Sequence, residues 1–107
     1  MSAPPPQARA VCGIVLHPAG HTLSPAIHAA AYRELGLDAS FRVFDVTADR
    51  LAATVRELRE AGLTQLCVSL PHKQPVMALA DRVTDHARAI GAANTLTLRE
   101  GALEADN

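Results

Sequence analysis

Lys73 is the first residue of this chain whose type and position could support chemistry. It ends the run Leu66-Cys67-Val68-Ser69-Leu70-Pro71-His72-Lys73, and an apolar run closed by a proline is typical of a buried strand. Ligands bind at the carboxyl ends of strands in α/β sheets. A lysine at such an end can attract an anion or donate a proton. The simpler interpretation is a surface lysine without a function, so a functional role for Lys73 needs support from other candidate residues.

Two hydroxyl side chains, Thr22 and Ser24, stand just before a predicted helix that starts at Pro25. Serine is a favourable N-cap, and proline suits the first helical position. The free N–H groups of a helix start, joined by hydroxyl donors, suit a carboxylate or a phosphate. The alternative is that Ser24 only caps the helix.

A third group of candidates surrounds the run Ile90-Gly91-Ala92-Ala93-Asn94-Thr95, where a predicted helix ends on glycine and a strand begins at once. The Asn94 amide can donate to and accept from a ligand hydroxyl, although it could equally form an Asx turn. Together with Ser69 and Lys73, the three segments offer hydroxyl, ammonium and amide groups. Such a set suits a small polyhydroxylated carboxylic acid.

These residues need a scaffold, and the pattern predicts strands that alternate with helices. Such alternation indicates an α/β three-layer sandwich with a mainly parallel sheet, helices on both faces and an antiparallel pair near the C-terminus. We expect apolar stripes on the first helix (Ile27, Ala30, Ala31, Leu35) and on the second, which Thr47 would cap (Leu51, Val55, Leu58). The predicted strands are 11–16, 40–46, 63–70, 95–99 and 102–105, and the helices are 25–35, 47–61, 75–83 and 84–90.

Composition narrows the class of protein. The chain has 107 residues, of which 49% are hydrophobic and 20% are charged, as expected for one packed domain. We expect a flexible proline-rich tail at 1–9 and a single domain at 10–107. The net charge of −1 argues against nucleic-acid binding, and no apolar run approaches the ~20 residues that cross a bilayer. The tail has no signal-peptide pattern, so we expect a cytoplasmic protein without membrane or nucleic-acid partners.

The two cysteines and five histidines do not predict a metal site. Cys12 and Cys67 lie in apolar runs and are expected to be small buried hydrophobic residues rather than a disulfide. His17 and His21 are four residues apart but are separated by Pro18 and Gly20, so they do not share a helical face. His28 and His86 are predicted to face solvent from helices, and His72 lies beside the candidate lysine.

The three candidate segments together resemble the N-terminal substrate-binding domain of the shikimate dehydrogenase family. That family carries a His-Ser-x-Ser-Pro loop, an Asn-Val-Thr-x-Pro-(His or Phe)-Lys strand end and an Ile-Gly-Ala-(Val or Ala)-Asn-Thr turn. They stand here, in the same order, as His21-Thr22-Leu23-Ser24-Pro25, Cys67-Val68-Ser69-Leu70-Pro71-His72-Lys73 and Ile90-Gly91-Ala92-Ala93-Asn94-Thr95. The resemblance covers most of the chain from Val11 onward.

This resemblance implies a reversible NADP-dependent reduction of 3-dehydroshikimate to shikimate in aromatic amino-acid biosynthesis. It implies that Thr22 and Ser24 hold the substrate carboxylate and that Ser69, Lys73 and Asn94 contact the ring hydroxyls. Lys73 would also pass a proton to or from the oxygen of the reacting carbon. NADP would be bound by a C-terminal Rossmann domain, and no Gly-x-Gly-x-x-Gly fingerprint occurs in this chain. We therefore expect no cofactor site in the chain and no turnover by it alone.

Departures from the family pattern leave the substrate open. Thr22 and Ser69 keep a hydroxyl where the family has serine and threonine, whereas Cys67 replaces an asparagine. Leu16 and Gln65 stand where the family commonly has glycine. A quinate or shikimate dehydrogenase-like paralogue is therefore one alternative, and a non-catalytic module that binds a small carboxylate is another.

The last residues, Asp106-Asn107, fall inside the family's (Gly or Asp)-Asn-Thr-Asp-Gly run. The resemblance implies that the aspartate that partners Lys73 lies just beyond Asn107, and we expect a truncated chain. An uncovered interdomain surface and a severed edge strand favour self-association of such a chain.

Overall fold

The structure of the chain, a computed structural model, describes residues 10–20, 24–36 and 39–107. The tail expected at 1–9 and the hydroxyl of Thr22 lie outside these described residues. The strands are β1 (Ala10–Leu16), β2 (Ala39–Asp45), β3 (Gln65–Val68), β4 (Arg82–Val83), β5 (Thr95–Arg99) and β6 (Ala102–Asp106). The helices are α1 (Ser24–Leu35), α2 (Leu51–Glu60) and α3 (Asp85–Ile90), with 3-10 turns η2 (Ala48–Arg50) and η3 (Pro75–Leu79).

One mixed sheet organises the chain, with the strand order β2-β1-β3-β5-β6-β4. The pairings β1–β2, β1–β3 and β4–β6 are parallel, whereas β3–β5 and β5–β6 are antiparallel. The predicted α/β class and the antiparallel pair near the C-terminus are thereby confirmed. Glu100 and Gly101 close the β5–β6 hairpin with φ values of 52° and 80°, the backbone form that a tight two-residue turn requires.

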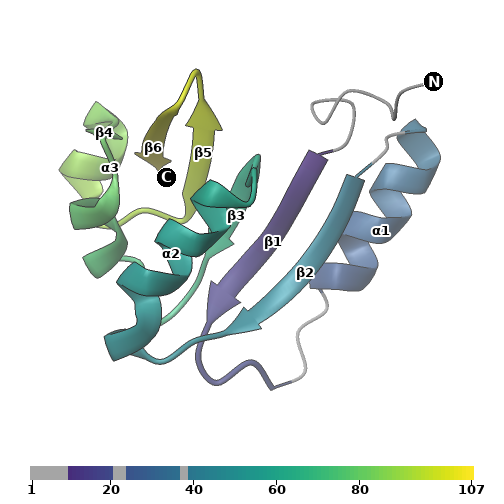
Figure 1. Ribbon diagram of the computed structural model, residues 1–107, viewed down its shortest axis with the longest axis horizontal. Helices are drawn as coiled ribbons and strands as arrows, with labels where there is room; N and C mark the ends of the chain where they lie inside the picture. Colours follow the sequence, from purple (N-terminus) through teal and green to yellow (C-terminus); the bar gives the residue numbers. More distant parts are fainter. Residues whose placement is uncertain (1–9, 21–23, 37–38) are drawn as a thin grey trace.

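The register places α1 and α2 on opposite faces of the sheet. Val15 pairs with Val68 and faces the core, whereas the alternating residue Cys12 pairs with Phe41 on the other face. His28 of α1 stacks on the Phe41 ring at a centroid distance of 4.1 Å, so α1 covers that second face. Figure 1 shows α2 in front of β3, with α1 beside β2.

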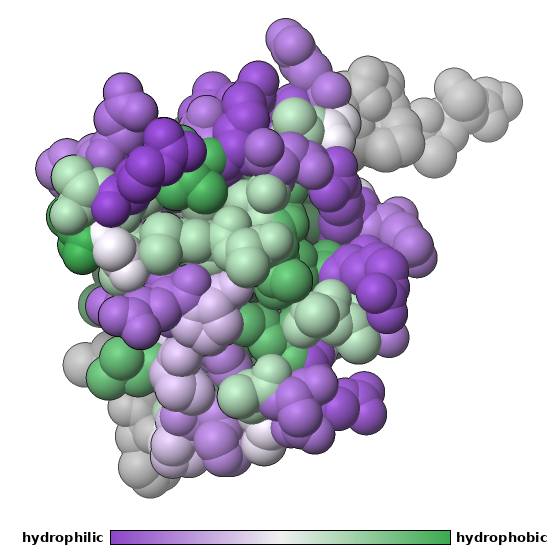
Figure 2. Space-filling view, turned by 90° about the vertical axis from the view of Figure 1, so that its left-hand side faces the viewer, coloured by the Kyte–Doolittle hydropathy of each residue, from purple (hydrophilic) through white to green (hydrophobic). Residues whose placement is uncertain are grey.

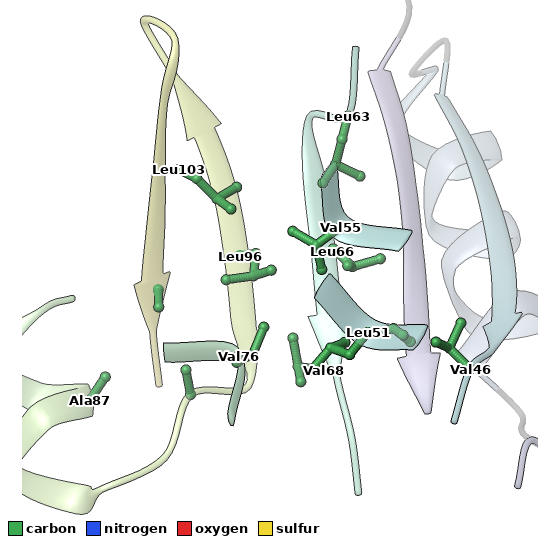
Figure 3. Close-up of a cluster of buried hydrophobic side chains, with 13 residues drawn as sticks. Val46, Leu51, Val55, Leu63, Leu66, Val68, Val76, Ala87, Leu96 and Leu103 are labelled. Carbon is green, nitrogen blue, oxygen red and sulfur yellow. The ribbon is translucent and has the colours of Figure 1, made fainter. Parts of the chain in front are cut away.

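The core lies between α2 and the sheet and extends to the hairpin. Leu51 and Val55 of α2 are buried, as their helical spacing predicts, and they lie over Leu66 and Val68 of β3 (Figure 3). The other side chains of the same cluster come from the segments around α2 and from the C-terminal half of the chain. They include Val15, Val46, Leu63, Val76, Ala87, Ala93, Leu96, Leu103 and Ala105.

The stripe predicted on α1 is not buried. Ile27 and Leu35 are 63% and 69% exposed, and Ala30 and Ala31 are exposed as well. Helical spacing identifies which side chains share a face, but it does not identify what covers that face. Gly36 does end the helix with a φ of 68°, as a left-handed C-terminal glycine should.

Three predicted details of the elements were wrong: one helix cap, one strand end and one stretch that was expected to be helical. Thr47 makes no side-chain capping bond, since the second helix starts through the 3-10 turn η2. The third strand ends at Val68 rather than Leu70 because the His72 N–H bonds the Ser69 carbonyl at 2.9 Å and turns the chain. Arg82–Val83 is not helical but forms β4, which pairs with β6.

The cysteines and the molecular surface complete the description. Cys12 and Cys67 are half-buried free thiols rather than fully buried ones, and burial, together with Cys12, raises the pKa of Cys67. Figure 2 shows a face on which hydrophilic side chains surround smaller hydrophobic areas. No helix in the described part of the chain is long and apolar enough to cross a membrane.

Candidate functional site

The topology places a switch point at the carboxyl ends of β1 and β3. Both β2 and β3 are parallel neighbours of β1. The connection from β1 to β2 passes through α1 on one face, whereas the connection from β2 to β3 passes through α2 on the other (Figure 1). The chain that leaves β1 leads to α1, whereas the chain that leaves β3 leads to η3, whose Val76 packs in the core with α2 on the opposite face. Such switch points are where open α/β sheets bind ligands.

Two backbone hydrogen bonds join the segments that leave β1 and β3. The Ser69 N–H donates to the Val15 carbonyl, and the His17 N–H donates to the Leu70 carbonyl, both at 3.0 Å. Ser69 is half-buried at the end of β3. The loop after β1 and the loop after β3 are thus held together, which fixes the backbone of Ser69 at this edge of the sheet.

Lys73 and Asn94 are 21 residues apart in the sequence but are brought to the same edge by the sheet. The Ala93 N–H donates to the Lys73 carbonyl, and the Val68 N–H donates to the Asn94 carbonyl, each at 2.8 Å. Because β5 runs antiparallel to β3, its first residue lies at the carboxyl end of β3. The structure therefore brings the backbones of Ser69, Lys73 and Asn94 together, as the sequence predicted. Lys73 is half-buried and Asn94 is exposed.

The Asn94 side chain is oriented locally, and its backbone is held by the C-terminal strand. The Thr95 hydroxyl donates to Asn94 Oδ1 at 2.9 Å, and the Asn94 N–H donates to the Asp106 carbonyl at 3.0 Å. The Asn107 amide donates to the Ala92 carbonyl at 3.0 Å. The turn that presents Asn94 is therefore braced on both sides by β6 and the residue that follows it.

Thr84 strengthens this brace at the start of α3. Its hydroxyl accepts from the Ala87 N–H at 3.1 Å, which confirms the predicted cap, and donates to Asp106 Oδ1 at 2.6 Å. That hydrogen bond, with a smaller contribution from the Asn107 N–H, lowers the pKa of Asp106. Gly91 ends α3 with a φ of 81°, as predicted.

The predicted carboxylate site at Thr22 and Ser24 is only partly described. Ser24 is the first residue of α1, the helix that follows β1, so the helix start belongs to the same edge of the sheet. Thr22 and the side chain of Ser24 lie outside the described part of the structure. Their contact with a carboxylate stays a prediction.

A second polar feature, which the sequence interpretation missed, lies at the carboxyl ends of β1 and β2. A cavity of about 520 Å³ is lined there by polar residues that include His17, Asp45, Thr47 and Arg50. His17 Nδ1 lies 2.7 Å from Asp45 Oδ1, and this bond, followed by the Ala19 N–H, lowers the pKa of Asp45. His17 follows one predicted strand and Asp45 lies near the end of another, but only the register between the strands reveals the pair.

The remaining histidines differ from one another. His86 is exposed, as predicted, whereas His28 is stacked on Phe41 rather than solvent-facing. His72 was predicted beside the site, but its side chain is fully buried and bonded to the Val46 carbonyl. Within the described ranges, no group of three or more His, Cys, Asp or Glu side chains could hold a metal ion.

Comparison with known proteins decides the family. The family described as "Shikimate dehydrogenase substrate binding domain" matches residues 14–96. This chain belongs to that family. The resemblance of the three segments at His21–Pro25, Cys67–Lys73 and Ile90–Thr95 is thereby confirmed.

Full-length relatives and solved structures agree with this assignment. The NADP(+) shikimate dehydrogenase of Methanopyrus kandleri is 43% identical over 91% of this chain, which matches 33% of that enzyme. The shikimate 5-dehydrogenase of Thermus thermophilus, solved with NADP(H) and shikimate, is 35% identical over 92% of this chain and 37% of its own, with a TM-score of 0.87. The 5-ketofructose reductase of Gluconobacter sp. strain CHM43 is 33% identical over 92% and 36%, with a TM-score of 0.89.

The chain spans about a third of the length of the curated shikimate dehydrogenases that it matches. A dinucleotide needs a glycine-rich turn at a helix start, and this sequence has no Gly-x-Gly-x-x-Gly run. This sequence thus lacks that fingerprint, and its residues 14–96 match the family described as the substrate-binding domain.

Proposed function

We propose that residues 10–107 form the substrate-binding domain of an NADP-dependent shikimate dehydrogenase that reversibly reduces 3-dehydroshikimate to shikimate. The observation that carries the proposal is the switch point at the carboxyl edge of the sheet, where hydrogen-bonded backbones bring Ser69, Lys73 and Asn94 together. A hydroxyl, an ammonium and an amide can share the hydrogen bonds of a polyhydroxylated ring among them. In this proposal NADP is bound outside this chain and supplies the hydride.

Lys73 is the proposed proton carrier. It lies beyond the end of β3, half-buried, with its backbone held by Ala93. An ammonium at that point can donate a proton to the oxygen that forms when the substrate carbonyl is reduced, and can accept it in reverse. Thr22 and Ser24 are proposed to hold the substrate carboxylate at the start of α1.

Binding can be tested on this chain by NMR. Titration of the ¹⁵N-labelled chain with shikimate should shift the amide signals of Ser69, Lys73 and Asn94, while those of β4 stay in place. Affinity should be weak, because the relatives have a further two thirds of chain that this domain lacks. Quinate and 5-ketofructose, titrated in parallel, test the paralogue alternative. Shifts spread evenly over the chain, or absent at the three residues, would contradict the proposed site.

The chemistry can be tested by joining this chain to the remaining two thirds of the Methanopyrus kandleri enzyme. Lys73→Ala should lower kcat by about 10²–10⁴-fold with a smaller change in KM, because it removes the proton carrier. Comparable losses in kcat and KM would show that Lys73 mainly binds. Ser24→Ala should chiefly raise KM, and an unaltered KM would remove its carboxylate role. If the fusion with no substitution binds shikimate but does not turn it over, the non-catalytic module is favoured.

A further inference from the structure

The Ser69 side chain lies on the face of the sheet that carries α1, opposite the core. Val68 is buried in the core, and successive side chains of a strand alternate between the two faces. The Ser69 N–H bonds the Val15 carbonyl at 3.0 Å, which extends the parallel register by one residue beyond the pair Val15–Val68. Leu16 is therefore the residue of β1 that lies beside Ser69, and by the same alternation its side chain is on the same face.

Cys67 is the next neighbour of Ser69 on this face. It stands two residues before Ser69 in the chain, and it pairs with Ile14 of β1 and Thr95 of β5. Ile14 is buried, whereas Leu16, Cys67 and Ser69 are half-buried. The partly open surface beside the Ser69 hydroxyl is therefore made of an isobutyl group and a thiol.

This surface offers a ligand very little hydrogen bonding. Burial, together with the neighbouring Cys12, raises the pKa of the Cys67 thiol. Cys67 is therefore a neutral thiol near pH 7, and a neutral thiol is a weak donor and a weak acceptor. The leucine side chain of Leu16 neither donates nor accepts.

Two other roles fit Cys67 less well. A nucleophilic or redox-sensing thiol needs a lowered pKa, and that of Cys67 is raised. A disulfide with Cys12 needs the two Cα atoms within about 7 Å. Cys12 pairs with Gln65 rather than with Cys67, so the usual spacings between and along strands put the two Cα atoms roughly 8 Å apart.

The family pattern differs at both positions that form this surface. It carries glycine in place of Leu16 and asparagine in place of Cys67. An asparagine beside Ser69 can exchange hydrogen bonds with a ligand hydroxyl, and a glycine leaves room for that hydroxyl. The two departures stand far apart in the sequence, but the register of β1 with β3 brings them to one place.

We propose that Leu16 and Cys67 are specificity-determining residues, and that the site takes a cyclic hydroxy acid that turns a C–H edge of its ring, rather than a hydroxyl, toward them. A hydroxyl pressed against a leucine and a neutral thiol loses its water without gaining a good partner, which costs affinity. An analogue of shikimate that lacks the hydroxyl on this side should therefore be accepted about as well as shikimate. This substrate class rests on the proposed function, whereas the position of the ligand beside Leu16 and Cys67 does not.

The first test measures turnover in the fusion with the remaining two thirds of the Methanopyrus kandleri enzyme. Its substrates are shikimate, 4-deoxyshikimate and 5-deoxyshikimate, which all keep the 3-hydroxyl that reacts. For at least one analogue, kcat/KM should lie within about tenfold of the value for shikimate, whereas a site that hydrogen-bonds the missing hydroxyl discriminates by about 10⁴–10⁵.

Substitutions in the same fusion locate the cause. Cys67→Asn should raise the preference for shikimate over that analogue by at least about tenfold, and Leu16→Gly added to it should raise the preference further. Cys12→Asn is the matched control, because Cys12 is on the same face but further from Ser69, and it should leave the preference unchanged. If Cys67→Asn does not fold, Cys67→Ser supplies a hydroxyl in nearly the same volume. A strong preference for shikimate over both analogues before substitution, or equal effects at Cys67 and Cys12, would overturn the inference.

The second test is independent of the reaction. In the 107-residue chain, saturating shikimate or deoxy analogue should slow the alkylation of Cys67 by iodoacetamide and leave that of Cys12 unchanged, as mass spectrometry of the peptides will show. Shifted amide signals of Lys73 and Asn94 without protection of Cys67 would overturn the inference. Protection of Cys67 in a chain whose unsubstituted fusion does not turn over would contradict the proposed function and leave the position of the ligand supported. The absence of binding by all three ligands would overturn both.

Discussion

Gly13 offers the sharpest test of how β1 is packed against β2. A Cβ at this position would lie 2.5 Å from the Arg42 carbonyl oxygen and 2.8 Å from Phe44 Cε2. The Phe44 ring can turn away, but the Arg42 carbonyl belongs to the backbone of the neighbouring strand, opposite Gly13 in the register. Gly13→Ala therefore has to push the two strands apart.

The size of the effect follows from that distance. Relaxed nonbonded contacts lie near ~3.5 Å, so the strands must separate by about 1 Å. Overpacking of this kind costs about 1–3 kcal/mol, and the backbone partner favours the upper end. A domain of this size loses roughly 4–8 °C in Tm per kcal/mol. We expect Gly13→Ala to lower Tm by about 10–20 °C.

Thermal and urea unfolding, followed by circular dichroism, measure this effect. Gly62→Ala is the matched control, because its φ of 92° strains any side chain while no atom lies within 4 Å of the added Cβ. Left-handed strain alone costs about 1–2 kcal/mol. Hydrogen exchange should also show protection lost at β1 and β2 but kept at the β5–β6 hairpin. A smaller destabilisation by Gly13→Ala than by Gly62→Ala would refute the packing of β1 on β2 described here.

Three further changes test the C-terminal half of the chain. Thr84→Val should lower stability by about 1 kcal/mol because the cap of α3 is lost, whereas Thr84→Ser should be nearly neutral; equal urea midpoints for the two would contradict the cap. Glu100→Gly should raise Tm, since Glu100 has a φ of 52°, and an unchanged Tm would argue against strain there. The Leu103 N–H, then Arg59, lowers the pKa of Asp81, so its contribution is present above the unfolded pKa of about 3.9 and is lost as pH falls through the lower folded-state pKa. Asp81→Asn should therefore weaken the acid dependence of unfolding, and identical pH profiles would contradict this.

Local patterns were enough to predict the class of fold and the positions of most elements. Ser24-Pro25 begins α1, and Gly36, Gly62 and Gly91 each follow a helix with a positive φ, because these signals act within a few residues. These local signals failed where a residue far away in the sequence decides the secondary structure. Arg82–Val83 is a strand only because β6 lies beside it.

The candidate site shows the same division. Ser69, Lys73 and Asn94 could be named from the sequence because each stands at the end of a predicted element. The pairing of His17 with Asp45 could not, since it depends on the register of β1 with β2. The direction of His72 could not either, because its neighbour Lys73 gives no indication that the imidazole bonds Val46 in the core.

The substrate cannot be read from the backbone of this domain, since a 5-ketofructose reductase and a shikimate 5-dehydrogenase match it with TM-scores of 0.89 and 0.87. The polar side chains at the sheet edge can discriminate between substrates. A site built to hydrogen-bond a substrate hydroxyl lowers kcat/KM for an analogue without that hydroxyl by a factor of about 10⁴–10⁵. In this chain that set is proposed to be Thr22, Ser24, Ser69, Lys73 and Asn94. Exchanging Ser69 for threonine, the residue that the family pattern carries, should therefore alter the ratio of shikimate to quinate affinity while leaving the fold unchanged. An unaltered ratio would locate the discrimination at the start of α1 instead.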